Sequence, residues 1–508
     1  MKEFLNTKID KIRINGTGFF LCAMSYIYIS IIIFLIGWTK YIISIPVSII
    51  LIIAIYKYYK KYKKNLENVE PIYIDIKMLI ALCITLFILS WILGWTGFAR
   101  QAGDYIKHNS VLSDLTNNTW PVYYENNGES SMLTYYLGQY IMPAFIGKIF
   151  SSANLSLFFN GIWAAFGLLL ATLGIFKVTK ANTTSKQIIA LCISLFFSTC
   201  VILSQALGKI FIKDIPISAG EWFMYNDEFR LQYSSNMTLL RWVFPQCIVP
   251  WITFSILYDN KFDIEHYVIL CLPMLFYSSF SFVGMIIFLF VMAIIYTIKN
   301  KDIKLVLKKI FSLSNVIVGL TLGGVLLLYF LGNLLVPKPD NIGLQLVEYS
   351  GTNILVYICF IISFLPYTIV LFKENKNNAF YWIATVLLLV LPFFKMGLNN
   401  DLCMRASIIP LFVYTILTIK TLINEKSKIY TIALLVILVI GSISSIAEFY
   451  ISLGNMSLEF IVGKTKYTLE EYANRNLNIP DDEKYNYYTY DLDSSIFYKF
   501  LVKEQINE

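Results

Sequence analysis

Charged residues are scarce in this chain. Asp, Glu, Lys and Arg together make up 15% of its 508 residues, whereas hydrophobic residues make up 57%. Soluble proteins have about a quarter of their residues charged, so this composition excludes an ordinary soluble globular protein. Apolar runs of roughly 18–22 residues recur instead, and each is long enough to cross about 30 Å of hydrocarbon. The sequence therefore predicts an all-α, polytopic membrane protein whose first partner is the lipid bilayer.

The chain also lacks several motifs that carry soluble chemistry. It has two histidines and eight cysteines, but no CxxC pair of the kind that binds zinc. Neither of the glycine-rich patterns that bind nucleotides, GxGxxG and GxxxxGK, occurs. The net charge of +8 is explained by lysine clusters that flank the apolar runs. These features argue against a nucleotide-driven machine, and no nucleic-acid partner is predicted.

Hydropathy predicts about thirteen membrane spans. They lie near 18–38, 41–58, 76–97, 155–177, 187–208, 242–258, 266–280, 282–299, 313–335, 352–373, 379–395, 404–423 and 428–449. The apolar stretch from Tyr267 to Ile298 is too long for one helix, so we expect a break near Ser281. With this count, the basic clusters such as Lys57–Lys64 and Lys299–Lys309 all fall on one side, which the positive-inside rule makes cytoplasmic. The N-terminus is then cytoplasmic and the C-terminus extracytoplasmic.

This topology divides the chain into a multi-span membrane domain, 1–449, and a small external tail, 450–508. The longest external loops are 98–154 and 209–241. The tail is too short for an independent catalytic domain, so chemistry is expected in the loops. Frequent Ile, Lys, Asn and Tyr are typical of an AT-rich bacterial genome, and we therefore expect the bacterial cytoplasmic membrane.

The first external loop carries a cluster of ionisable residues. If residues 102–116 are helical, Asp104, Lys107, His108 and Asp114 fall within an arc of about 120°, and Gly103 lets the chain turn sharply before them. The alternative is that Asp104 caps a surface helix and that His108 is a surface hydrogen-bonding residue. Two carboxylates and one imidazole could hold a divalent metal but do not identify one, so no cofactor or metal is predicted.

A second segment, Asn400-Asp401-Leu-Cys-Met-Arg405-Ala-Ser407, opens the twelfth span on the same side. A helix start suits an anion, and the planar guanidinium of Arg405 suits a phosphate. Asp401 or Asn400 is expected to cap this helix. The alternative for Arg405 is that it snorkels to the membrane interface or pairs with Asp401 one turn away.

A third segment, Arg241-Trp-Val-Phe-Pro245-Gln246-Cys247, also lies at an outer membrane boundary. Arg241 is a candidate phosphate contact, with a simple interfacial anchor as the alternative. Gln246 has to find a hydrogen-bond partner in an apolar setting.

Taken in order, these three segments resemble a bacterial branch of the GT-C superfamily, integral-membrane glycosyltransferases that draw sugars from polyprenyl-phosphate carriers. The loop around Asp104 resembles the loop that holds the family's catalytic carboxylate. Phe-Pro245-Gln246-Cys247 resembles the branch's Pro-Gln-His motif, with cysteine in place of histidine, and Asn400–Pro410 resembles its late motif. The resemblance implies that Asp104 is the catalytic carboxylate; its position suggests Arg405 as a lipid-phosphate contact.

The function that this resemblance implies is transfer of a sugar from a polyprenyl-phosphate donor to a glycan, lipid or protein acceptor outside the cytoplasm, in cell-envelope glycan modification. One alternative is a transporter or flippase for a lipid-linked sugar, since such proteins use broken helices. A glycan polymerase or ligase is a second, and a structural scaffold is a third. The scarcity of charge at the centres of the spans favours surface chemistry over ion-coupled transport.

Overall fold

The protein is mostly helical (75%). The computed structural model describes residues 11–14, 16–66, 71–97, 99, 101, 103–126, 129–218, 221–225, 230–260, 262–334, 343–349, 351–397, 400–424, 427–454, 487–489 and 491–504. Most of the predicted external tail, 455–486, therefore lies outside the described residues.

Within this described part, eight helical segments are long and apolar enough to cross a membrane. Five are single helices: α1 (Gly16–Trp38), α2 (Tyr41–Leu66), α6 (Ala153–Thr179), α13 (Ser279–Asn300) and α22 (Lys428–Gly454). Three contain an interruption: α7 (Thr184–Phe196) with α8 (Val201–Phe211), α15 (Leu313–Val318) with η2 (Gly319–Gly323) and α16 (Gly324–Leu334), and α20 (Asp401–Ala406) with α21 (Ile408–Asn424).

The remaining apolar segments are bent or shorter. A bend of 48° separates α17 (Thr352–Ile361) from α18 (Leu365–Asn375). The shorter helices are α3 (Ile76–Ile92), α10 (Phe244–Asp259), the series η1 (Ile264–His266), α11 (Tyr267–Cys271) and α12 (Met274–Tyr277), and α19 (Ala379–Val390) with η3 (Leu391–Phe393). Every predicted span thus coincides with a helical segment, and the predicted break near Ser281 is found at Ser278, which caps α13. The number of spans that cross the bilayer stays a prediction.

The outer faces of the long helices are apolar. Isoleucine side chains of α2 are exposed at positions 42, 45, 49, 52 and 53, and α22 exposes a similar series from Ile429 to Ile451. A soluble protein rarely shows apolar patches of this extent, whereas lipid tails cover them without cost. The protein is therefore a polytopic α-helical membrane protein.

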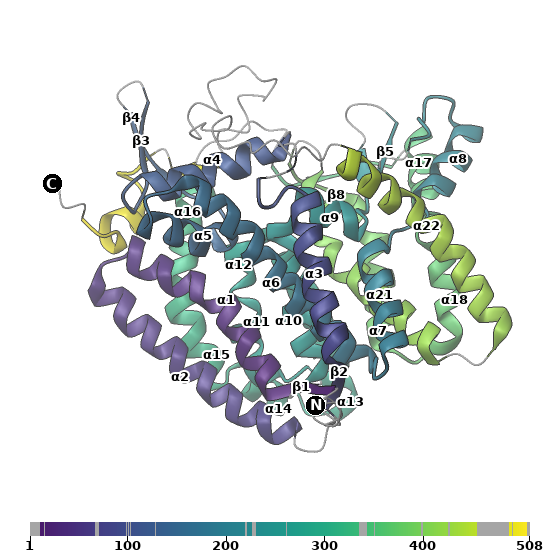
Figure 1. The fold of residues 1–508 in the computed structure, drawn as a ribbon, viewed down its shortest axis with the longest axis horizontal. Helices are drawn as coiled ribbons and strands as arrows, with labels where there is room; N and C mark the ends of the chain where they lie inside the picture. Colours follow the sequence, from purple (N-terminus) through teal and green to yellow (C-terminus); the bar gives the residue numbers. More distant parts are fainter. Residues whose placement is uncertain are drawn as a thin grey trace, which may run out of the picture.

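The elements outside the long helices gather at two opposite ends of the bundle (Figure 1). At one, called the loop end, lie α4 (Asp104–Asn117), α5 (Gly138–Ile149) and α9 (Asn236–Trp242) with three small antiparallel sheets. The strands are β3 (Tyr123–Asn126), β4 (Glu129–Leu133) and β9 (Tyr488–Thr489); β5 (Trp222–Met224) and β6 (Arg230–Gln232); and β7 (Gln345–Leu346) and β8 (Phe394–Lys395).

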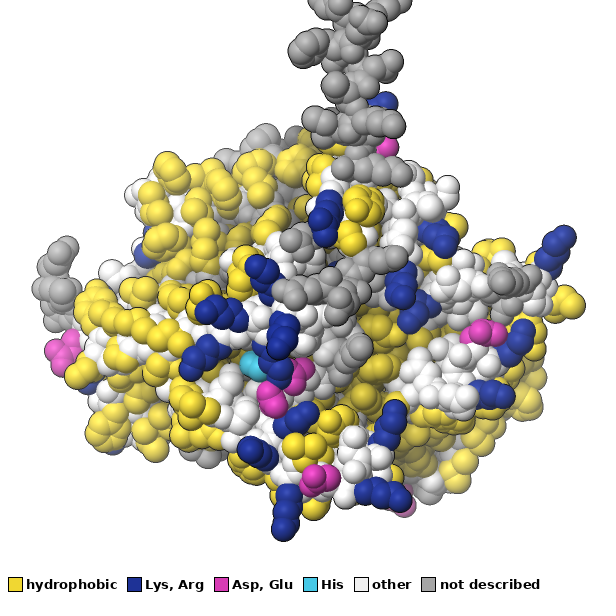
Figure 2. Space-filling view, turned by 90° about the horizontal axis from the view of Figure 1, so that it is seen from below, with side chains coloured by type: hydrophobic (Ala, Val, Ile, Leu, Met, Phe, Trp, Pro, Cys, Tyr) yellow, Lys and Arg dark blue, Asp and Glu magenta, His cyan; other side chains and the backbone are white. Residues whose placement is uncertain are grey.

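The opposite end, called the lysine end, holds the β1 (Lys11–Ile14) and β2 (Ile72–Asp75) pair and α14 (Ile303–Ile310). Lys and Arg side chains are frequent on this face, with hydrophobic side chains around them (Figure 2). The last turns of α2, α6 and α13 each carry lysine. These lysines lie at one end of the bundle, and the side of the membrane that this end faces stays a prediction.

The C-terminal residues return to the loop end. Strand β9 pairs with β4, with Met132 opposite Thr489. Val502 bridges Thr39 at the turn between α1 and α2, and the backbone N–H of Lys503 donates to the carbonyl of Trp38 at 3.0 Å. The described part of the predicted tail is therefore packed against the membrane domain.

Candidate active site

Helix α4 begins at Asp104, two residues after the expected start of the helix at 102. Gly103 precedes it with a φ of +58°, a conformation that suits glycine, and a Cβ at this position would lie 3.2 Å from the Trp242 ring. The chain therefore turns at Gly103, and Asp104 occupies the first turn of the helix. The Asp104 side chain does not cap the helix.

Asp104 borders a cavity of about 750 Å³ at the loop end. Residues from widely separated parts of the chain line it. They include Asp104 and Lys107 of α4, Tyr136 and Glu221 of the loops, Gln232 of β6, Trp242 of α9, Phe280 of α13, Phe330 of α16, Asp401 and Arg405 of α20, and Glu448 of α22. The first and second sequence segments thus meet in one cavity, as an active site requires.

Asp104 is the accessible carboxylate of its helix. Its side chain is 42% exposed, and its Oδ1 lies 3.3 Å from the Nζ of Lys107, which is 9% exposed. Burial opposes ionisation of Asp104, but Lys107 and then His108 and Arg405 lower the pKa of its carboxyl below the ordinary value. Asp104 raises the pKa of Lys107 in return, against the effect of burial. Both groups are therefore charged at neutral pH.

Arg405 reaches the cavity from α20. Its Nη2 lies 3.0 Å from Asp401 Oδ1, so the predicted pairing one turn away is present. Its Nη1 donates to the Tyr136 hydroxyl at 3.3 Å, and its buried Nε has no hydrogen-bond partner. The guanidinium therefore has donor capacity beyond its ion pair.

The start of α20 differs from the prediction in one respect. Asn400 holds the N-cap position in a left-handed conformation, but neither it nor Asp401 caps the helix with its side chain. Asn400 Nδ2 instead donates to the carbonyl of Arg230 at 3.3 Å, and Asp401 turns to Arg405. The left-handed backbone at Asn400 directs its side chain away from the first turn of the helix.

Gln246 and Arg241 contact residues that line the cavity. Gln246 is buried, and its Nε2 donates to the Tyr136 hydroxyl at 2.8 Å, which supplies the partner that its burial demands. Arg241 Nη1 lies 2.7 Å from Glu448 Oε1, and Trp242 Nε1 donates to the same oxygen at 2.7 Å. Glu448 and Trp242 line the cavity, whereas Arg241 and Gln246 do not. Arg241 therefore has a carboxylate partner already.

His108 and Asp114 lie away from the cavity, although they share α4 with Asp104. The Trp242 carbonyl can only accept, so His108 Nε2, 3.0 Å away, carries the hydrogen, and Nδ1 accepts from the Tyr140 hydroxyl. Burial and the Lys107 charge lower the pKa of His108 to about 4, so the ring is neutral. Asp114 is buried and accepts from Tyr124 at 2.7 Å. Of the four polar residues on this arc of α4, Asp104 and Lys107 line the cavity, whereas His108 and Asp114 are buried in the interior.

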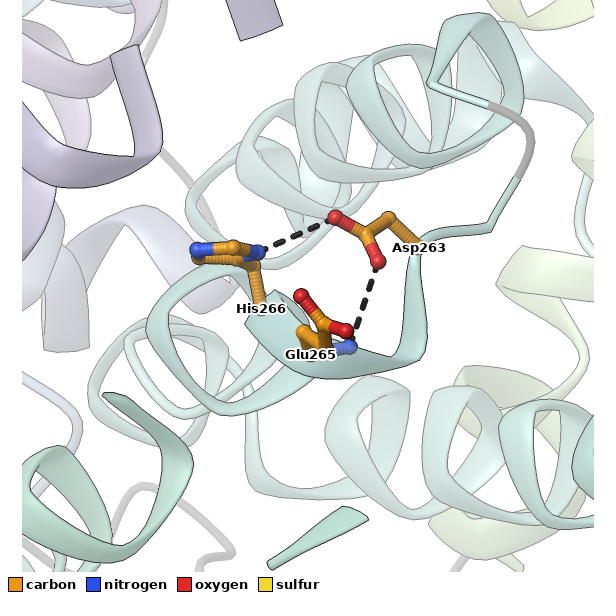
Figure 3. A group of neighbouring side chains, drawn as sticks. All are labelled: Asp263, Glu265 and His266. Carbon is orange, nitrogen blue, oxygen red and sulfur yellow. Dashed lines mark hydrogen bonds and ion pairs between the residues drawn. The ribbon is translucent and has the colours of Figure 1, made fainter. Parts of the chain in front are cut away.

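A different cluster has the composition of a metal site. Among the residues that the structure describes, Asp263, Glu265 and His266 bring three candidate ligand atoms within 4.8 Å of one another, at the lysine end (Figure 3). His266 Nδ1 lies 3.0 Å from Asp263 Oδ2, and Lys61 Nζ lies 2.6 Å from Asp263 and 2.5 Å from Glu265. Burial raises the pKa of the Asp263 carboxyl, but His266 and Lys61 outweigh this effect and lower it to about 2. The lysine ammonium already occupies the cation position.

The sequence alone did not single out Glu221 or Glu448. Both line the cavity, although Glu221 comes from the second external loop and Glu448 from the last long helix. Their approach depends on packing between α9 and α22, which no local pattern encodes. The one available signal was that each lies near the outer end of the bundle in the predicted topology.

Comparison with models of known protein families, with curated proteins and with solved structures finds no match to this chain. The resemblance of the three segments to the GT-C superfamily therefore stays a prediction from sequence. The chemistry of the cavity has to carry the functional argument.

Proposed function

We propose that the protein is a membrane glycosyltransferase that moves a sugar from a polyprenyl-phosphate carrier to an acceptor hydroxyl outside the cytoplasm. The observation that carries this proposal is that Asp104 and Arg405 line one cavity at the loop end. A carboxylate and a guanidinium in one cavity suit an acid–base step and an anionic leaving group. The predicted sidedness places this end on the outer face of a bacterial cytoplasmic membrane, where the product would enter cell-envelope glycans.

In the proposed reaction, the acceptor oxygen forms a bond with the anomeric carbon while the bond from that carbon to the lipid-phosphate oxygen breaks. Asp104 takes the proton of the acceptor hydroxyl, and the bonding electrons leave with the phosphate. Arg405 and Lys107 offset the negative charge that grows on the phosphate. The same cations lower the basicity of Asp104. They therefore stabilise the departing phosphate but make Asp104 a weaker proton acceptor.

The apolar part of the cavity wall supports a lipid carrier. Leu275, Phe280, Phe330 and Leu334 line the same cavity as the charged residues, and Leu334 is 56% exposed at the end of α16. Polar and apolar walls in one cavity fit a ligand with a charged head and a hydrocarbon tail. A water-soluble nucleotide sugar would gain nothing from the apolar wall.

The direct test is Asp104→Asn in proteoliposomes supplied with a panel of polyprenyl-phosphate monosaccharides and an envelope-glycan acceptor fraction. The substitution removes the proton acceptor and keeps the shape, so we expect the transfer rate to fall by roughly 10²–10⁴. The unfolding midpoint in detergent shows whether the variant is folded. Asp263→Asn is the control, because Asp263 is a paired carboxylate at the other end, and its transfer rate should match that of the unsubstituted chain. Equal rates for the Asp104 and Asp263 variants would remove Asp104 from the reaction.

The interrupted helices favour a second candidate function, a flippase for a lipid-linked sugar. The segments α7–α8, α12–α13 and α17–α18 are interrupted, as in many transporters. Transbilayer movement of the lipid-linked sugar without transfer to an acceptor would favour this function. Transfer of an oligosaccharide from a lipid diphosphate would instead identify a polymerase or ligase.

A further inference from the structure

Three residues that line the cavity carry buried side-chain oxygen atoms that have no hydrogen-bond partner. Glu221, Gln232 and Ser234 all line the cavity and are 4%, 5% and 3% exposed. Glu221 Oε1, Gln232 Oε1 and Ser234 Oγ each lack a partner. Buried polar groups in folded proteins are nearly always hydrogen-bonded, so three unpartnered oxygens on residues of one cavity call for an explanation.

One carboxyl oxygen of Glu221 is held by a hydrogen bond, whereas the other has no partner. Its Oε2 accepts from the backbone N–H of Ser235 at 2.7 Å, which fixes the carboxyl at the start of α9. Burial raises the pKa of Glu221 to about 7, and the neighbouring Glu448 contributes to this shift. Glu448 itself is paired with Arg241. The residues that line the cavity therefore include acceptors as well as the cations Lys107 and Arg405.

The chemistry of these three side chains selects the ligand. Carboxyl and amide oxygens accept hydrogen bonds, and a serine hydroxyl can accept or donate. Trp222 and Trp242 line the same cavity and bring aromatic rings to it. Several acceptors beside aromatic rings fit a neutral ring that carries many hydroxyl groups. An anion would find mostly acceptors on these three side chains.

We infer that Glu221, Gln232 and Ser234 form a subsite that binds the hydroxyl groups of a sugar ring. This inference rests on the proposed function and deepens it, because it separates a sugar subsite from the phosphate subsite around Arg405. The sugar could belong to the donor or to the acceptor, since both present the same hydroxyl chemistry. The three side chains are almost wholly buried, so binding requires them to turn toward the cavity.

The test measures binding rather than transfer. The full chain in lipid nanodiscs is titrated with decaprenyl phosphate and with the same lipid carrying glucose, galactose, mannose or N-acetylglucosamine. Methyl glycosides of the four sugars are tested separately by saturation-transfer NMR. The variants are Glu221→Gln, which can still accept from Ser235, and Ser234→Ala, which removes an oxygen without a partner. Ser204→Ala is the matched control, because Ser204 is equally buried but donates to the carbonyl of Cys359 at 2.7 Å and does not line the cavity.

A donor sugar in the subsite predicts that Glu221→Gln and Ser234→Ala each weaken binding of one sugar-carrying lipid about tenfold, the loss expected for a hydrogen bond to a buried charged or polar group. Binding of bare decaprenyl phosphate should not change. An acceptor sugar predicts the same loss for a methyl glycoside instead. The control should match the unsubstituted chain throughout, and Ser234→Ala should not lower the unfolding midpoint.

Unchanged sugar binding in both variants would overturn the inference, as would the absence of any sugar-dependent binding in the unsubstituted chain. Neither result would touch the proposed phosphate subsite. Conversely, glycoside binding that depends on Glu221, with no binding of decaprenyl phosphate, would retain the sugar subsite and reject the polyprenyl-phosphate donor.

Discussion

The two ends of the bundle contain similar charged residues, but those at the lysine end are paired with one another, whereas those at the loop end keep atoms without partners. At the lysine end, Lys61 is bound to Asp263 and Glu265, and Lys177 is bound to Asp259. At the loop end, Asp104 is 42% exposed, Arg405 Nε and Glu221 Oε1 lack partners, and all three residues line one cavity. Charges that satisfy one another serve the fold, whereas charges with unused capacity around a cavity are available to a ligand.

This contrast also explains why residue type alone is a poor guide to the site. Asp263, Glu265 and His266 look more like a metal site in sequence than Asp104 does. Their geometry is closed by Lys61, and the stacking of Tyr58 on His266 at 4.4 Å fixes the imidazole further. The cluster at the lysine end is therefore assigned to stability.

The largest effect that would test this contrast is expected from Lys177→Met. The Lys177 and Asp259 side chains are 6% and 10% exposed, so the substitution leaves a buried carboxylate without its cation. Removing one partner of a buried pair costs about 3–5 kcal/mol. We expect the free energy of unfolding in detergent to fall by that amount, with the transfer rate per folded molecule unchanged. Lys299→Met, at an exposed lysine in the last turn of α13, should have little effect, and equal losses in the two variants would contradict the assignment.

A smaller effect is expected at Glu221 and depends on pH. The pKa of this carboxyl rises from 4.5 to about 7 on folding, so between these values the folded state holds a proton that the unfolded state has lost. Stability should therefore fall as the pH rises from about 4.5 to about 7, by up to about 3 kcal/mol, and then level off. Unfolding midpoints measured from pH 4.5 to 8 should show this decline in the unsubstituted chain. Glu221→Gln should lack it, and the same slope in both chains would assign it to other groups.

The smallest effect is expected from Arg405→Lys. Lysine keeps the charge but loses the planar fork that matches a phosphate and the Nε that has no partner. The apparent affinity for decaprenyl phosphate should fall about tenfold, the loss expected for one charge-assisted hydrogen bond. Lys61→Arg at the other end is the matched exchange and should leave this affinity unchanged. Full affinity in the Arg405 variant would make its pairing with Asp401 its whole role.

Much of the fold follows from local sequence. Hydropathy placed a helical segment at every predicted span because lipid selects apolar residues directly. Gly103 and Asp104 marked the start of α4 because the turn needs a positive φ. The break at Ser278 was anticipated from the polar residues within the stretch 267–298.

The site was only partly predictable. Asp104 and Arg405 were selected from sequence, and the fold brings both to one cavity. His108 and Asp114 could not be separated from Asp104 because their partners, Tyr140 and Tyr124, come from later in the chain. Glu221 was overlooked because its unpartnered oxygen exists only after α9, β5 and β6 pack around it. Burial and the presence of a hydrogen-bond partner depend on the tertiary structure, so they cannot be predicted from residue spacing.

The central claim is that the lipid-phosphate donor binds at the loop end, between α4 and α20. The most direct measurement is photocrosslinking of the full chain in nanodiscs with a decaprenyl phosphate that carries a diazirine beside its phosphate, followed by peptide mapping. We predict adducts within 104–117 and 401–424, with loss of these adducts when excess unlabelled decaprenyl phosphate competes. Competed adducts confined to the lysine end, within 258–266 or 57–66, would contradict the account.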